Sequence, residues 1–109
     1  MPTAIPTLAA QVITATGSEA AGHELINDSL DLEIVVTAVS GTSPSITFSV
    51  QWSDDGSTFE PASPADAFTA MTGTGGVVER FTVKGAFYRL AWTVSGTTPS
   101  FTVNVFEYV

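Results

Sequence analysis

The chain has 109 residues, with eleven acidic side chains against three basic ones and a formal net charge of −8. It contains no cysteine, which excludes a disulfide framework and a thiolate metal site. Its length suits one domain that buries roughly two-thirds of its unfolded surface. The acidic balance opposes binding to a nucleic-acid backbone, and no apolar run approaches the roughly 20 residues of a membrane helix. We therefore expect neither a nucleic acid nor a membrane as a partner.

The first residues predict an extended arm over 1–9, ahead of a folded domain over 10–109. Pro2 and Pro6 favour an extended, polyproline-like backbone, and no basic segment of a secretory signal accompanies them. Such an arm is suited to lie along a neighbouring subunit, where it can add a strand to an exposed sheet edge. Gln11–Thr16 then has the composition of a short strand.

Alternating apolar residues predict two strands in the first half of the domain, over Asp31–Val39 and Ile46–Trp52. One parity in each run is expected to face the core, because successive residues of a strand point to opposite faces. The segment Asp54-Asp55-Gly56 is a tight-turn signal, since glycine accepts the left-handed conformation that this turn needs. The predicted core residues are Leu32, Ile34, Val36, Ala38, Ile46, Phe48, Val50 and Trp52.

The second half of the chain predicts further strands separated by turns. Val77–Lys84 alternates, with Phe81 and Val83 inward, and Phe87–Val94 with Phe101–Tyr108 is expected to form a last hairpin. No stretch has a helical apolar period with caps. We therefore predict an all-β fold, a single antiparallel β-sandwich, Ig-like or jelly-roll-like, of about seven to nine strands. The less regular segments are an expected loop or edge over Glu60–Pro64, a short strand over Phe68–Met71 and a turn over Gly73–Gly76.

A twelve-residue motif occurs twice, 55 residues apart. Val39–Val50 and Val94–Val105 are identical at eight of twelve positions, around Val-Ser-Gly-Thr-Ser-Pro-Ser and Val-Ser-Gly-Thr-Thr-Pro-Ser. Each copy leaves a β-branched run, crosses a turn-like segment and enters an alternating run, which is the pattern of a β-hairpin. We therefore expect two hairpins. The strands before the copies differ in which face is apolar, and a β-bulge in one copy would account for this.

Motifs that carry chemistry are weak in this chain. Gly73-Thr-Gly-Gly76 lacks the Lys-Ser/Thr and the helix of a phosphate loop, and Val78 stands where a dinucleotide fingerprint needs glycine. His23 is the only histidine and falls short of the three or four donors of a zinc site. Asp54 and Asp55 offer paired carboxylates, but a sandwich of this size leaves little room for a glycosidase cleft. We therefore predict no enzymatic activity, no metal and no cofactor.

Several apolar residues fall on strand faces that are expected to be exposed to solvent. Val35, Val39, Phe106 and Tyr108 have the parity opposite to the predicted core, and a strand that is apolar on both sides is covered on both sides. A second layer of the domain or another subunit would provide this cover. The predicted interface adds the arm and the three bases to these four residues, namely Pro2, Ile5, Pro6, Leu8, Arg80, Lys84 and Arg89.

The three bases fall within ten residues and interleave with Phe81, Phe87 and Tyr88. Aromatic and basic side chains together can form a platform for single-stranded nucleic acid. Three bases against eleven acids make that use unfavourable. We expect instead a patch that forms ion pairs with another acidic protein surface.

Four segments of turn and strand motifs support a resemblance that covers roughly residues 11–108. They are Val36–Ser45 (VTAVSGTSPS), Gln51–Phe59 (QWSDDGSTF), Phe87–Ala91 (FYRLA) and Val94–Val103 (VSGTTPSFTV). Together they resemble a type of small β-sandwich protein encoded among the virion structural genes of tailed bacteriophages. Proteins of this type are capsid decoration or accessory proteins, or small head or tail proteins. They offer no catalytic residues to transfer to this chain.

The resemblance implies a capsid decoration or stabilising protein, located in the virion and assembled in the host cytoplasm. Its implied partners are copies of itself and the major capsid protein or another virion protein. A small tail or head–tail connector component is the alternative within this class. A carbohydrate-binding or adhesin module is the alternative from another class, and it needs a row of exposed aromatic side chains. The candidates for that row are Trp52, Phe59, Tyr88, Trp92 and Tyr108, of which we expect both tryptophans to be buried.

Overall fold

The computed structural model describes residues 3–109 and confirms the all-β prediction. Within these residues there are seven strands, every strand pairing is antiparallel, and no helix is present that could cross a membrane. The strands are β1 (Ala4–Ile13), β2 (Gly17–Ser18), β3 (His23–Glu24), β4 (Ser29–Ser53), β5 (Glu60–Ala67), β6 (Gly75–Thr82) and β7 (Phe87–Tyr108).

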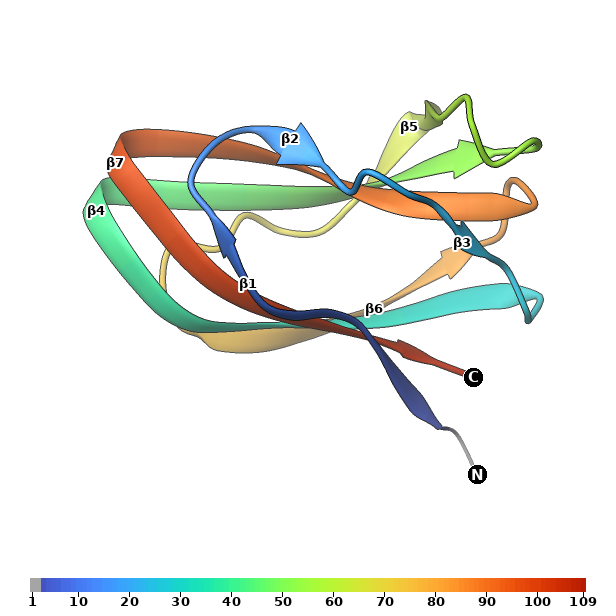
Figure 1. Ribbon diagram of the computed structural model, residues 1–109, viewed down its shortest axis with the longest axis horizontal. Coiled ribbons are helices and arrows are strands. Elements are labelled where there is room, and N and C mark those ends of the chain that lie inside the picture. Colours follow the sequence, from blue (N-terminus) through green and yellow to red (C-terminus); the bar gives the residue numbers. More distant parts are fainter. Residues whose placement is uncertain (1–2) are drawn as a thin grey trace.

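Two long strands contribute to both layers of the molecule. β4 has 25 residues and β7 has 22, and they run together as one antiparallel ribbon, from the pair Asp31–Tyr108 to the pair Ser53–Phe87. The ribbon bends sharply near its middle and folds back, so that its two halves face each other (Figure 1). The result is a sandwich-like fold made from one continuous sheet.

The shorter strands widen each half of the ribbon into a layer. We call the first half, residues 29–40 of β4 with 100–108 of β7, the β1 layer, because β1 flanks it on one side and β6 on the other. The second half, residues 45–53 with 87–95, is the β5 layer. It is flanked by β5 on one side and by β2 and β3 on the other (Figure 1).

The hydrophobic core fills the space between the two layers. The alternation predicted from the sequence is confirmed in β4, where every second side chain from Leu30 to Val36 and from Ile46 to Trp52 is buried. The same parity holds in β7 from Phe101 to Val105. Full burial of one such side chain contributes roughly 1.5–3 kcal/mol. The core residues outside these runs are Ile13, Phe68, Phe81, Tyr88 and Leu90.

A β-bulge in β4 makes Ala38 the exception to the predicted core. Val36 pairs with Val103 but Ala38 pairs with Thr102, so Thr37 is an extra residue on the β4 side. One extra residue reverses the faces of the strand beyond it. Ala38 is therefore exposed, whereas Val39, which was expected on the outer side, packs against the core. The bulge expected near one copy of the repeat is confirmed.

The prediction of two hairpins is wrong, because the two copies of the repeated motif meet each other at the bend of the ribbon. Thr42 pairs with Thr97, its equivalent in the other copy. Gly41 and Gly96 have nearly the same φ, 109° and 113°. An antiparallel pair has local two-fold axes between its strands, so similar sequences that face each other can bend in the same way. Turn residues here bend a continuous strand instead of ending it.

Each glycine of the bend lies tightly against the opposite copy. A Cβ atom on Gly41 would lie 2.7 Å from the carbonyl oxygen of Thr98, and one on Gly96 would lie 2.8 Å from that of Ser43. Ser43 and Thr98 themselves have positive φ angles of 49° and 46°. The approximate two-fold symmetry of the bend therefore extends to its backbone conformation.

The predicted arm is part of the sandwich. Its residues are extended as expected, but from Ala4 onward they belong to β1, which pairs with β7 of the same chain. Pro2 lies outside the described residues. The expected loop or edge at Glu60–Pro64 is the start of the edge strand β5, and the expected strand at Phe68–Met71 is reduced to a single bridge between Met71 and Ile46.

Candidate interaction surfaces

The outward-pointing residues of the β1 layer form one continuous surface, which we call the outer face. Strand register places Phe106 beside Pro6 on one side and Glu33 on the other, with Val78 next to Glu33. Val78 is 60% exposed, Pro6 is exposed, and Phe106 is half-buried. The three rows of this face are Ala4–Tyr108–Asp31–Arg80, Pro6–Phe106–Glu33–Val78 and Asn104–Val35–Gly76.

Polar groups on the outer face are paired with one another. Nε of Arg80 lies 2.6 Å from Oδ1 of Asp31, and the hydroxyl of Tyr108 donates to Oε1 of Glu33 at 3.0 Å. The ion pair raises the pKa of Arg80, and the hydrogen bond raises the pKa of Tyr108. An antiparallel sheet that faces water is usually polar on that side. The outer face instead combines exposed apolar side chains with one ion pair and with a carboxylate, Glu33, that accepts a hydrogen bond from Tyr108.

Among residues 3–109, five residues of the predicted interface come together on the outer face, and the other five do not. Leu8 and Val39 pack against the core, and Ile5 is on the core side of β1 at its exposed end. Lys84 and Arg89 contact the β5 layer, as described below. The five that gather are Pro6, Val35, Arg80, Phe106 and Tyr108.

Sequence reasoning missed Val78 as a residue of this face. Its parity in Val77–Lys84 is opposite to that of the buried Phe81, so the alternation already placed it outward. Val12 of β1 is also a large apolar residue of the same layer, and it is 55% exposed. The signal in both cases is an apolar residue at an outward position.

The three bases do not form one patch. Nζ of Lys84 lies 2.9 Å from Oδ2 of Asp66 and above the ring of Trp52. Arg89 donates from Nε to Oε1 of Gln51 and lies over the ring of Phe59. Each base therefore has partners within its own chain.

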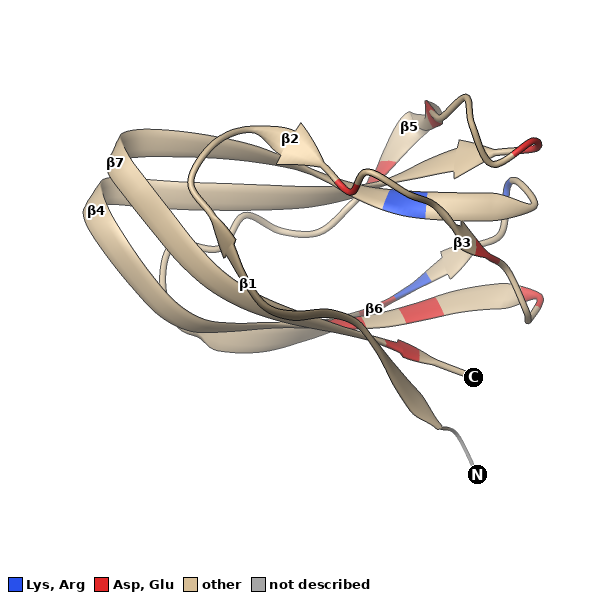
Figure 2. Cartoon of the chain, in the orientation of Figure 1, with Lys and Arg blue, Asp and Glu red and all other residues tan. Residues whose placement is uncertain are grey.

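Charged residues are absent from the part of the sandwich around the bend of β4 and β7. Residues 1–18, 34–53 and 90–106 contain no Asp, Glu, Lys or Arg. Figure 2 shows the result: the end with the bend of β4 and β7 has no charged residue, and the acidic residues lie toward the opposite end. Repulsion between this chain and another acidic protein is therefore weakest at the bend and on the adjoining surface.

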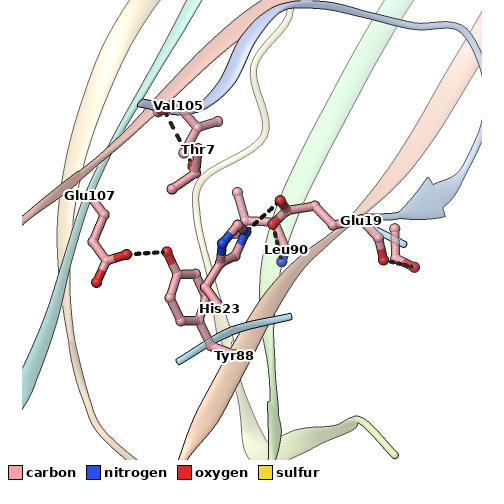
Figure 3. Close-up of polar contacts among 8 residues, drawn as sticks. Thr7, Glu19, His23, Tyr88, Leu90, Val105 and Glu107 are labelled. Atoms are coloured by element: carbon pink, nitrogen blue, oxygen red, sulfur yellow. Dashed lines mark hydrogen bonds and ion pairs between the residues drawn. The ribbon is translucent and has the colours of Figure 1, made fainter. Parts of the chain in front are cut away.

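Two carboxylates are buried near β2 and β3, and both have hydrogen-bonding partners (Figure 3). Glu19, 8% exposed, accepts from the backbone N–H of Leu90 at 2.9 Å and pairs through Oε2 with Nε2 of His23 at 2.7 Å. Glu107, 6% exposed, accepts from the hydroxyl of Tyr88 at 2.8 Å. Glu107 shares the parity of Phe101 and Val105, so the sequence pattern already placed this acid inward.

These contacts raise the pKa values of His23 and Tyr88. The hydrogen bond to Glu19 raises the pKa of His23 above its usual 6.5, although partial burial opposes the shift. Burial and the nearby Glu107 raise the pKa of Tyr88 far above its usual range. A hollow of about 360 Å³ lies beside His23, between Leu8 and Trp92. Since the bonds of Glu19 are already made within the fold, we interpret this group as one that fixes the β2–β3 segment onto the β5 layer.

The turn after β4 is built around Asp55. Its Oδ1 accepts from the backbone N–H groups of Ser57 and Thr58, at 2.8 and 2.9 Å, and from the hydroxyl of Ser53. These bonds lower the pKa of Asp55 to about 2. Gly56 has the left-handed φ of 79° that the Asp-Gly signal predicted. The hydrogen bonds give Asp55 a role in the turn itself.

The aromatic side chains do not form an exposed row. Trp52 is 6% exposed and Tyr88 is fully buried, while Trp92 is half-buried with its ring packed edge-on against Phe48. Phe59 is half-buried on the β5 side, beneath Arg89. A flat stack of aromatic rings for sugars is therefore not formed by these residues.

Comparisons with protein-family models, curated proteins and solved structures found no match to this chain. The surfaces described above are consequently the basis on which its function is proposed.

Proposed function

We propose that this chain is a structural protein of a tailed-bacteriophage virion, a capsid decoration or stabilising protein that acts by binding its neighbours. The observation that carries the proposal is the outer face of the β1 layer. On this face the exposed Val78 and Pro6 lie in one row with the half-buried Phe106, and neighbouring apolar side chains of this kind are a feature of protein–protein contact surfaces. The turn and strand motifs that resemble phage virion proteins supply the class of partner.

The charge distribution supports the same kind of use. Free copies with a net charge of −8 repel one another and stay soluble at high concentration. The uncharged bend is the part that another acidic surface can approach at least electrostatic cost, and on the outer face Arg80 offsets the charge of Asp31. Many weak contacts of this kind on a repeated shell add up to firm attachment.

The test is co-sedimentation of the purified protein with phage heads stripped of their accessory proteins. We expect saturable binding in a fixed ratio to the capsid subunit. Phe106→Gln should weaken binding at least about tenfold, because it replaces an apolar contact on the outer face. Ile26→Gln, an equally apolar-to-polar change at a residue that is 66% exposed between β3 and β4, should bind as the wild type does.

Two outcomes would replace the proposed function with one of its alternatives. Binding to purified tails or connectors with no binding to heads would make the protein a tail or head–tail component. A wild-type protein that binds neither, but whose tryptophan emission changes with added oligosaccharides, would favour the sugar-binding module. Thermal unfolding of the Phe106 variant checks that lost binding is not lost folding.

A further inference from the structure

The two layers have four outer edges, and three of them are interrupted. An open edge strand presents unpaired N–H and C=O groups that can pair with another chain, and proteins usually block such edges. The pairing of β1 with β7 breaks between Pro6 and Leu8 and again between Leu8 and Gln11. β5 contains Pro61 and Pro64, which lack an N–H donor. β2 and β3 have only two residues each.

The fourth edge, β6, is continuous. Its eight residues contain no proline and pair with β4 without a register shift, from Ser29–Thr82 to Val36–Gly75. Among residues 3–109, β6 pairs with no other strand, so its second side is open. Six of its eight residues are exposed, including Val78. Two charged residues lie on this edge: Glu79, which points to the core side, and Arg80, which points to the outer side and is paired with Asp31.

We propose that β6 pairs with β6 of a second copy of this chain, antiparallel about a two-fold axis at Val78. The strand increases in size along its length, from Gly75 and Gly76 to Arg80 and Phe81. In a pairing centred on Val78, the two largest residues of one copy, Arg80 and Phe81, lie opposite Gly76 and Gly75 of the other. β6 is therefore complementary in shape to its own antiparallel copy.

The charges of β6 favour the same register. Residues that face each other must lie on the same side of the sheet, so the pairing is centred on a residue and not between two residues. A centre at Glu79 or Arg80 would place two identical charges in direct opposition, which is destabilising. A centre at Val78 places Glu79 opposite Val77 and Arg80 opposite Gly76. It is the longest pairing within β6 that avoids opposed like charges.

This contact would join two β1 layers into one sheet, with four strands from each copy. The outer faces would then continue across the two-fold axis, because Val78 belongs to both the edge and that face. The inference rests on strand pairing alone and does not depend on the proposed virion function. Since each copy carries a net charge of −8, salt should strengthen the association by screening the repulsion.

The test is the solution mass of the full chain, measured by sedimentation equilibrium across protein concentration at low and moderate salt. We expect a dimer that tightens as salt increases. Val78→Lys places two ammonium groups opposite each other and should weaken the dimer at least about tenfold, although it lowers the net negative charge of each chain. Val12→Lys is the matched control: a valine that is 55% exposed on β1 of the same layer, with the same change in charge.

Two further variants test the register. Mixing Val78→Lys with Val78→Glu should restore a dimer, because opposite charges then face each other. Val78→Cys should form an intermolecular disulfide under mild oxidation, since directly opposed strand residues have Cα atoms about 4.5–5.5 Å apart. Val12→Cys should not. A wild-type monomer at all concentrations, or a dimer that Val78→Lys leaves unchanged, would overturn the proposal.

Discussion

Alanine at either glycine of the bend should destabilise the whole sandwich. At Gly41 the new Cβ would lie 2.7 Å from the carbonyl oxygen of Thr98 and 2.9 Å from Cα of Pro99. Both atoms belong to the backbone of the opposite strand, so no side-chain rotation can relieve the contact. The φ of 109° is in addition one that L-residues rarely adopt.

The two effects give the expected magnitude. A strained backbone conformation costs of order 1–3 kcal/mol, and forcing atoms into a packed site costs about 1–3 kcal/mol more. Gly41→Ala should therefore reduce the free energy of unfolding by about 2–6 kcal/mol. In a domain of this size that corresponds to a fall in Tm of roughly 4 °C or more per kcal/mol.

The local two-fold symmetry adds a sharper expectation. Gly96→Ala meets Ser43 and Pro44 at 2.8 and 2.9 Å, so it should cost the same as Gly41→Ala within about 1 kcal/mol. Gly73→Ala is the control, because no atom lies within 4 Å of its Cβ position and its φ is not positive. Urea denaturation followed by circular dichroism measures all three. Wild-type stability for Gly41→Ala, or a large loss for only one of the two bend glycines, would refute the symmetric bend.

Three other predictions concern polar groups. Tyr88→Phe leaves the buried Glu107 without its donor and should cost about 1–3 kcal/mol in urea denaturation. Tyr108→Phe removes a hydrogen bond that is only partly buried, so it should cost less than Tyr88→Phe; equal effects would contradict the burial of Glu107. His23, the only histidine, should titrate above pH 6.5 by NMR. Its raised folded-state pKa means that its stabilising contribution is complete below pH 6.5 and is lost as pH rises through that pKa, a dependence that His23→Gln should abolish. Asp55 has a lowered pKa of about 2, so its contribution to the stability of the fold is present above pH 3.8 and is lost as pH falls through 2. Carbon-detected NMR titration measures this pKa, and an ordinary value would contradict the turn geometry.

Alternation predicted the strands well where one face is fully apolar. Ile46 to Trp52 is the clearest case, since each inward position there is aliphatic or aromatic and each outward position is polar. The prediction failed beyond Val36, because the extra residue Thr37 reverses the faces and exchanges the roles of Ala38 and Val39. Nothing in the local composition distinguishes a bulge from a regular strand at that point.

The bend was misread for a related reason. Gly, Ser, Thr and Pro after a strand are used both to end it and to bend it, and local sequence does not say which. The partner of the first motif is its own second copy, a contact across 55 residues that no local pattern reveals. The outer face was easier to predict, since Phe106 and Tyr108 alternate with buried residues, and the strand register then places them in successive rows of the same face as Val35.

The bend also limits how β4 and β7 can align during folding. The two strands form both layers. A register shift of two residues between them would keep every apolar side chain on its correct face, so burial in the core would not prevent it. The bend does prevent such a shift, because Gly41 must face Thr97–Pro99 while Gly96 faces Thr42–Pro44. A slipped alignment would press side chains against backbone at both places. The two copies of the repeated motif thus disfavour every other alignment of β4 with β7. Because these strands run through both layers, the bend fixes the register of both layers together.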